Sequence, residues 1–252
     1  MKVVEPKIQK DGKTISTIVS LPDGADHPSV VIMLHGGPGG RKTGPGRVFE
    51  TLTETLVKKG IATIRFDFLG EGDSDGKYMD MTFAGQRAEY QQILHYARTS
   101  GFGSIGLLAE SYGGATAVAE YSHDIKCLGL LWPTIDLLDT SFKAYLTPDR
   151  LSELARNGFI NDGEFQIGRE FIRELQEEGN VLQHVSKIVA PTIIIHGTAD
   201  NEVPYQQSQA IFDRLGKPKK LWIIKRAGHA IDDPNLLPSI EKQLSEWFTK
   251  YL

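Results

Sequence analysis

The sequence has little cysteine, no long apolar run and no block of basic residues, and each shortage excludes a class of protein. The single cysteine, Cys127, cannot form an internal disulfide, which suits a reducing compartment. No uncharged apolar stretch approaches the roughly 18 residues that span a bilayer, and the first residues lack the apolar core of a signal peptide. The net charge of -4 gives no electrostatic reason to expect nucleic acid. We therefore expect a cytoplasmic protein that binds neither membranes nor nucleic acid.

Patterns typical of metal and phosphate sites are also missing. The cysteine is alone, and the histidines do not pair at the spacing of metal ligands. The acidic stretch DFLGEGDSDG at 67–76 lacks the spacing of a calcium loop. The glycine-rich stretch HGGPGG at 35–40 is not followed by the Gly-Lys-Ser/Thr of a P-loop. We therefore expect no metal and no cofactor.

What the sequence does contain is a regular alternation of short apolar runs and helical intervals. Two alternating stretches joined by Asp11-Gly12 predict an N-terminal antiparallel hairpin. Six later runs are typical of strands buried on both faces of a mostly parallel sheet, namely SVVIML, IATIRF, SIGLLAE, KCLGLLW, PTIIIHG and KLWIIK. Helices are expected near 47–59, 82–99, 112–121, 205–215 and 235–250. This order predicts a doubly wound α/β fold.

One interval between predicted strands is too long for a simple crossover. It runs from Trp132 to Pro191, whereas a crossover with one helix needs only a dozen or more residues. Helical pieces are expected at 148–157 and 164–178, the second entered through Asn161-Asp162-Gly163. We therefore divide the chain into an α/β core, residues 1–132 and 188–252, and an inserted helical cap, residues 133–187.

Polar residues follow the predicted strands at their carboxyl ends, where open α/β sheets bind ligands. The segments in question are HGGPGG (35–40), DFLGEGDSDG (67–76), ESYGG (110–114), TADNEVP (198–204) and RAGHA (226–230). Ser111 stands between a buried strand and the glycines that open the next helix. A serine hydroxyl is a weak nucleophile, so it needs a base in contact with it and a third group that holds the base.

These segments resemble the motifs of the α/β-hydrolase superfamily along nearly the whole chain. AESYG at 109–113 resembles the nucleophile elbow G-x-S-x-G, with alanine in place of the first glycine. The resemblance implies that Ser111 is the nucleophile, that His229 is the base, and that Asp200, in HGTADNEVP, is the acid. It also implies an oxyanion hole formed by the backbone amides of Gly37 and Tyr112.

Other histidines and acids compete for these roles. His35 and His196 directly end strands, and the resemblance implies that such histidines brace loops. Asp136 is the alternative acid, because some members of the superfamily carry their acid after that strand. Asp232 and Asp233 are too near His229 in sequence to orient it from behind. The remaining histidines are expected at surface or packing positions, and they are His27, His95, His123 and His184.

The resemblance implies a serine hydrolase that cleaves small-molecule carboxylic esters through an acyl-enzyme. The 67–76 loop and the cap resemble those of small feruloyl or cinnamoyl esterases. HGGPG is also typical of proline iminopeptidases, so an enzyme of that type or another acyl-peptide hydrolase is the enzymatic alternative. A ligand receptor on the same fold is the alternative from another class. In the cap, Leu137, Phe142 and Tyr145 are expected to bind the substrate. A second copy of the chain, in a homodimer, is the candidate protein partner.

Overall fold

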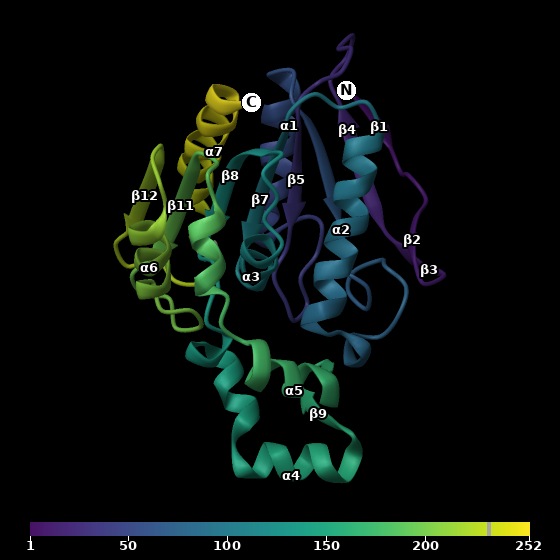
Figure 1. Ribbon diagram of the computed structural model, residues 1–252, viewed down its shortest axis with the longest axis vertical. Helices are drawn as coiled ribbons and strands as arrows, with labels where there is room; N and C mark the ends of the chain where they lie inside the picture. Colours follow the sequence, from purple (N-terminus) through teal and green to yellow (C-terminus); the bar gives the residue numbers. More distant parts are fainter. Residues whose placement is uncertain (231–232) are drawn as a thin grey trace.

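The computed structural model describes residues 1–230 and 233–252, and within them a large sheet of eight strands carries helices on both faces (Figure 1). In spatial order its strands are β1 (Lys2–Val4), β4 (Thr17–Leu21), β6 (Ala62–Phe66), β5 (Val30–Leu34), β7 (Ile105–Glu110), β8 (Ile125–Leu131), β11 (Thr192–Gly197) and β12 (Lys219–Ile224). The β1–β4 and β4–β6 pairs are antiparallel, and the other neighbours are parallel. The predicted doubly wound, mostly parallel sheet is confirmed.

The strands read as continuous apolar runs because both faces of the sheet are covered. One face packs against α1 (Val48–Lys58) and α7 (Leu237–Tyr251). The other packs against α2 (Phe83–Thr99), α3 (Tyr112–Ala119) and α6 (Gln206–Arg214). In β5, Val31 and Met33 pack on the face covered by α1 and α7. The alternate residues Val30, Ile32 and Leu34 pack on the face covered by α2, α3 and α6, as the two-residue period of a strand requires.

The N-terminal hairpin is present, but it is shorter than the alternating pattern suggests. It consists of β2 (Ile8–Lys10) and β3 (Lys13–Ile15), and the turn residues Asp11 and Gly12 have φ values of 50° and 79°. The preceding residues form β1 and pair with β4 instead. Pro6 separates the two strands, because proline has no N–H to donate to a ladder.

The segment between β8 and β11 lies beyond the carboxyl edge of the sheet, as the positions of α4, β9 and α5 in Figure 1 show. Its elements are η3 (Leu137–Asp139), η4 (Ser141–Leu146), α4 (Pro148–Asn157), β9 (Phe159–Asp162), β10 (Phe165–Gly168), α5 (Arg169–Glu178) and η5 (Leu182–Lys187). Shorter 3₁₀ turns elsewhere are η1 (Pro45–Arg47), η2 (Tyr78–Asp80) and η6 (Pro234–Leu236). The division into core and cap at residues 133 and 187 stays a prediction.

The predicted helix over 164–178 is confirmed only from Arg169 onward, and the prediction for residues 164–168 is wrong. Residues 159–168 form the antiparallel hairpin β9–β10, and α5 begins only at Arg169. Gly163 has a φ of 59° at the tip of the hairpin, and Ile160 and Ile167 are paired and fully buried. Burial of this isoleucine pair favours a strand pair over continued helix.

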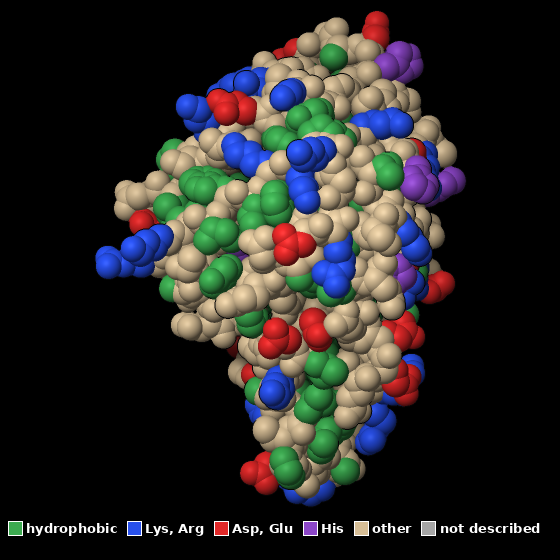
Figure 2. Space-filling view, turned by 60° about the vertical axis from the view of Figure 1, so that its left-hand side comes forward, with side chains coloured by type: hydrophobic (Ala, Val, Ile, Leu, Met, Phe, Trp, Pro, Cys, Tyr) green, Lys and Arg blue, Asp and Glu red, His purple; other side chains and the backbone are tan. Residues whose placement is uncertain are grey.

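Charges of both signs are interspersed over the face drawn in Figure 2, where the lower end of the molecule narrows to a tip. Cys127 is buried in β8, as its apolar surroundings predict. In the part of the chain that the structure describes, no helix combines the length and apolarity needed to cross a membrane.

Candidate active site

Ser111 occupies a strained turn between β7 and α3. Its φ and ψ are 50° and −125°, a conformation that non-glycine residues rarely adopt. The turn is tight because α3 starts directly against the strand end: a Cβ atom at Gly113 would lie 2.5 Å from the carbonyl oxygen of His35. Ala109, the residue that departs from the motif, is fully buried in β7, so one methyl group is accommodated there.

The structure brings together the three residues predicted as a triad. Nε2 of His229 lies 3.0 Å from Oγ of Ser111, and Nδ1 of His229 lies 2.7 Å from Oδ2 of Asp200. Since a carboxylate only accepts, Nδ1 carries the proton of the neutral ring, and Nε2 is left to accept from the serine hydroxyl. This arrangement can transfer a proton from Ser111 to the imidazole.

Asp200 is held by donors on both oxygens. Oδ1 accepts the backbone amides of Glu202 and Val203, at 2.9 and 2.8 Å. Oδ2 is shared by His229 and His196, and Nε2 of His196 lies 3.0 Å from it. Burial raises the pKa of Asp200, but the hydrogen bonds from the two histidines lower it by more, so its pKa lies well below the ordinary value. Asp200 is therefore ionised at neutral pH.

The pKa of His229 is raised, because negative carboxylates stabilise the protonated form of its ring. Burial lowers its pKa, whereas the hydrogen bond and the negative charge of Asp200, together with the charges of Glu202 and Glu110, raise it by more in sum. Its ring lies edge-on to Trp132, with 6.2 Å between the ring centroids. The imidazolium form of His229 is thus stabilised in the position where it would receive the serine proton.

A cavity of 410 Å³ opens at Ser111. Its walls include the loop 36–41, Ser111, Glu202 and His229. Gly37, a predicted oxyanion donor, belongs to this wall. Tyr112, the second predicted oxyanion donor, is the first residue of α3. Its N–H therefore has no acceptor within the helix. An oxygen bound at Ser111 could therefore accept from the start of α3.

His35 fixes the orientation of one peptide in this loop. The amide of Phe68 donates to Nε2 of His35 at 3.0 Å, so the ring proton is on Nδ1, which donates to the carbonyl of Gly36 at 2.6 Å. Burial lowers the pKa of His35 to about 4, and the ring is neutral at ordinary pH. His35 and His196 thus both contact loops, as the resemblance implies.

The three cap residues predicted to bind substrate lie elsewhere. Leu137, Phe142 and Tyr145 are 1%, 7% and 6% exposed, and within the described residues none of them lines the cavity at Ser111. Phe142 instead packs edge-on against Tyr112, with centroids 5.6 Å apart, and Tyr145 donates to Asp162. Apolar spacing alone does not distinguish the packed side of a cap from its open side. Contact of these residues with substrate stays a prediction.

Two of the other acids considered, Asp136 and Asp233, have hydrogen-bond partners other than the imidazole. Asp136 accepts a hydrogen bond from Asn180, and Asp233 accepts from the backbone and side chain of Asn235. Asp232 lies outside the described residues. Among residues 1–230 and 233–252, no group of three or more His, Cys, Asp or Glu side chains is arranged to hold a metal ion.

Three glutamates at the site were not identified from the sequence as functional. Glu110 precedes the serine, Glu71 lies between two glycines of the 67–76 loop, and Glu202 follows Asp200 by two residues. Glu71 and Glu110 are 4% and 6% exposed. A sequence signal was available for Glu71, which is flanked by Gly70 and Gly72. The backbone amides that Glu71 and Glu110 accept belong to the loop after another strand, and no local pattern reveals that.

Comparisons with known proteins agree with this fold. Residues 161–252 match the sequence pattern of the prolyl oligopeptidase family. The mitochondrial palmitoyl-protein thioesterase ABHD10 of Mus musculus is 29% identical over 180 residues, which cover 67% of this chain but only 59% of that protein. The predicted hydrolase fold is confirmed by solved structures of similar proteins.

Three solved structures cover almost the whole chain. A protein from Agrobacterium vitis whose structure is named a "Putative hydrolase" has a TM-score of 0.77 at 20% identity, and the match covers 98% of both chains. Est1E from Butyrivibrio proteoclasticus with bound ferulic acid has a TM-score of 0.72 at 25% identity, covering 96% of this chain and 98% of that one. Mouse alpha/beta hydrolase domain-containing protein 10 has a TM-score of 0.71 at 21% identity, covering 97% and 98%.

Proposed function

We propose that this chain, which has the α/β-hydrolase fold, is a serine hydrolase that cleaves carboxylic esters through an acyl-enzyme. The observation that carries the proposal is the continuous hydrogen-bonded chain from Ser111 through His229 to Asp200, which opens on a cavity. A ligand receptor has no need of a strained serine in contact with a base whose tautomer is fixed by a buried carboxylate.

In the proposed reaction, Oγ of Ser111 attacks the ester carbonyl while Nε2 of His229 takes its proton. The carbonyl electron pair moves to oxygen, and the resulting oxyanion is stabilised by the amides of Gly37 and Tyr112. When the electron pair returns, the carbon–oxygen bond to the alcohol breaks, and His229 gives its proton to the leaving alkoxide. Water then attacks the acyl-enzyme with His229 again as base, and the acid is released.

The finer proposal is an esterase of the feruloyl or cinnamoyl type. It is supported by the 67–76 loop and by the similarity to Est1E, whose solved structure holds ferulic acid. A peptidase is the second candidate, because residues 161–252 match the prolyl oligopeptidase family. A thioesterase is related in chemistry to both, and the mouse relative is named as one. The cytoplasmic location and the homodimer also stay predictions.

The deciding experiment compares wild type with Ser111→Ala on p-nitrophenyl esters, a hydroxycinnamate ester, a palmitoyl thioester and a prolyl anilide. We expect ester turnover in the wild type and a loss of at least about 10⁴-fold in the variant. A fluorophosphonate should label Ser111, located by peptide mass spectrometry. Ser186→Ala is the matched control, because this exposed hydroxyl donates to the backbone of Gln183. Near-normal turnover by Ser111→Ala, or a label elsewhere, would contradict the proposal, and the preferred substrate separates esterase from peptidase.

A further inference from the structure

The glycine-rich loop at 36–40 is held by two buried carboxylates from neighbouring strand ends. Oε1 of Glu110 accepts the amide of Gly36 at 2.5 Å. Oε1 of Glu71 accepts the amides of Gly39 and Gly40 at 2.8 and 3.1 Å. Three amides of the loop are therefore directed into the protein.

The amide of Gly37 is directed differently because of its own peptide plane. His35 Nδ1 donates to the carbonyl of Gly36, which belongs to the same peptide as the Gly37 N–H. In a trans peptide the C=O and N–H groups point in opposite directions, and the cis bond in this loop is the following one, Gly37-Pro38. The Gly37 N–H therefore points away from His35, and Gly37 lines the cavity at Ser111.

We propose that Glu71 and Glu110 are positioning residues that hold the loop 36–40 so that the Gly37 amide faces the oxygen of the reacting carbonyl. The proposal rests on the proposed hydrolase function and deepens it. Glu110 acts on the start of the loop and Glu71 on its end, so the Gly37 peptide is fixed from both sides. Glu110 also lines the cavity at Ser111, whereas among the described residues Glu71 does not, so the test is made at Glu71.

Burying the carboxylates of Glu71 and Glu110 costs stability, so packing alone does not explain why they are there. Burial raises the pKa of both groups, and the amides they accept oppose that shift. Oε2 of Glu110 accepts from Nε1 of Trp132 at 3.1 Å. Among the described residues the buried Oε2 of Glu71 has no hydrogen-bond partner, because Nδ1 of His35, 3.7 Å away, donates to the carbonyl of Gly36 instead. A buried polar atom without a partner costs stability, and such costs persist where function requires the geometry.

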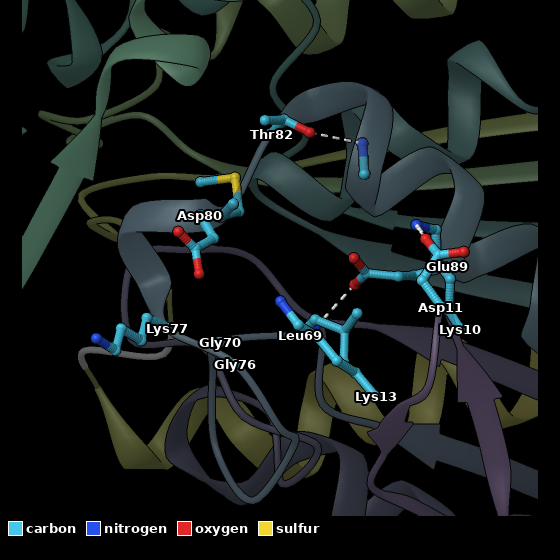
Figure 3. A pocket seen from close by; sticks show the side chains of 12 residues that line it. Lys10, Asp11, Lys13, Leu69, Gly70, Gly76, Lys77, Asp80, Thr82 and Glu89 are labelled. Carbon is cyan, nitrogen blue, oxygen red and sulfur yellow. Dashed lines mark hydrogen bonds and ion pairs between the residues drawn. The ribbon is translucent and has the colours of Figure 1, made fainter.

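The alternative is that Glu71 only stabilises the fold and has no effect on the reaction. Glu89 provides the matched control for this alternative. Glu89 is also a buried glutamate, 6% exposed, and its Oε2 accepts one backbone amide, that of Leu69, at 2.8 Å. Figure 3 shows this bond in a separate pocket of 170 Å³, lined by Lys10 and Lys13 among others. Among the described residues, the linings of this pocket and of the Ser111 cavity share no residue.

The test replaces Glu71 by glutamine and by methionine. Glu71→Gln keeps a carbonyl acceptor for Gly39 and Gly40, so kcat should stay within about three-fold of wild type. Glu71→Met keeps the length but has no acceptor, and kcat should fall roughly 30- to 100-fold with KM within about two-fold, because the oxyanion contact exists only in the transition state. Affinity for a trifluoromethyl ketone, which forms an oxyanion on the serine, should fall by the same factor as kcat/KM.

Rates are normalised to the serine that a fluorophosphonate titrates, which removes any misfolded fraction. Glu89→Met should lower the melting temperature but leave kcat per titrated serine unchanged. If Glu71→Met does not fold, Glu71→Asp takes its place, because it withdraws the acceptor by one methylene; about a ten-fold loss of kcat is then expected.

Wild-type kcat in the folded Met or Asp variant, or an equal kcat loss in Glu89→Met, would overturn the positioning role while leaving the hydrolase proposal intact. A wild-type protein that neither hydrolyses esters nor reacts with the fluorophosphonate would overturn both.

Discussion

Oε2 of Glu202 lies 3.9 Å from Nε2 of His229, the same nitrogen that faces Ser111. Glu202 is exposed, so its charge acts partly through solvent. Its negative charge still favours the imidazolium, and it adds to the larger effect of Asp200 on the pKa of His229. The proton affinity of the proposed base is therefore raised by Asp200 at one ring nitrogen and Glu202 at the other, with a smaller contribution from Glu110.

The first prediction is a displaced acidic limb in the pH profile. His229 acts as a base only when neutral, and its pKa is raised, so kcat/KM should rise with pH through an apparent pKa above the ordinary histidine value of about 6.5. Glu202→Gln removes one charge that favours the imidazolium, so the midpoint should move to lower pH. Rates of p-nitrophenyl ester hydrolysis from pH 5 to 9 measure it. Glu246→Gln, an exposed glutamate on α7, should leave the midpoint unchanged, and an unchanged midpoint in Glu202→Gln would contradict the argument.

The second prediction concerns His196 as a positioning residue behind Asp200. Its Nε2 faces two acceptors, Asp200 and the carbonyl of Val203, so this nitrogen is protonated, and Nδ1 accepts from Ser208. Hydrogen bonds to charged groups contribute about 1.5–3 kcal/mol, so His196→Ala should lower kcat by roughly ten-fold or more. Ester kinetics measure this loss, with His95→Ala on the exposed side of α2 as control.

The same substitution should change how stability depends on pH. The pKa of Asp200 is lowered in the folded protein, so its contribution is present above the unfolded value of about 3.9 and is lost as the pH falls. Removing the His196 hydrogen bond reduces that contribution. Urea unfolding should therefore show the same loss of stability for His196→Ala at pH 7 and pH 4, but a smaller loss near pH 2, where the pH approaches the low folded-state pKa of Asp200. An equal loss at pH 7 and pH 2 would contradict the linkage.

Sequence patterns predicted the sheet well, because a strand buried on both faces is apolar throughout and its carboxyl end is marked by glycine and polar residues. The pairing of Ser111 with His229 came from the resemblance to the α/β-hydrolase superfamily, and it agrees with the rule that ligands bind at the carboxyl ends of the strands. Sequence patterns missed the β9–β10 hairpin, because its stability depends on burial of Ile160 and Ile167 under other elements. They could not place Phe142, because its partners Tyr112 and Phe171 lie far away in the sequence.

The third prediction is a large loss of stability at a buried ion pair next to the glycine-rich loop. Nζ of Lys42 lies 2.5 Å from carboxylate oxygens of both Asp67 and Asp73, and Asp67 is 1% exposed. Lys42→Met leaves the charge of Asp67 buried without its cation, so the free energy of unfolding should fall by about 3–5 kcal/mol. Adding Asp67→Asn should recover part of the loss, because it removes the unpaired charge.

Denaturant unfolding monitored by tryptophan fluorescence measures this change. Lys242→Met is the control, because Lys242 forms an exposed pair with Glu246 at 4.0 Å and should change stability by less than about 1 kcal/mol. A loss below 1 kcal/mol in Lys42→Met would show that solvent replaces the lysine.

The last prediction concerns Phe142, whose place in the structure differs from the one expected of a substrate-binding residue. Its ring lies edge-on to Tyr112 and to Phe171, at 5.6 and 5.5 Å between centroids, and stacks on Tyr145. Because Tyr112 carries the proposed oxyanion amide, Phe142 connects the cap to the elbow through packing. Phe142→Ala should therefore destabilise the fold by about 3–5 kcal/mol and lower kcat for short and long acyl esters by similar factors. Leu138→Ala, at an exposed apolar residue of the same segment, should do neither. If Phe142→Ala instead reorders ester preference at unchanged stability, the ring reaches the substrate, and the role predicted from the sequence is the correct one.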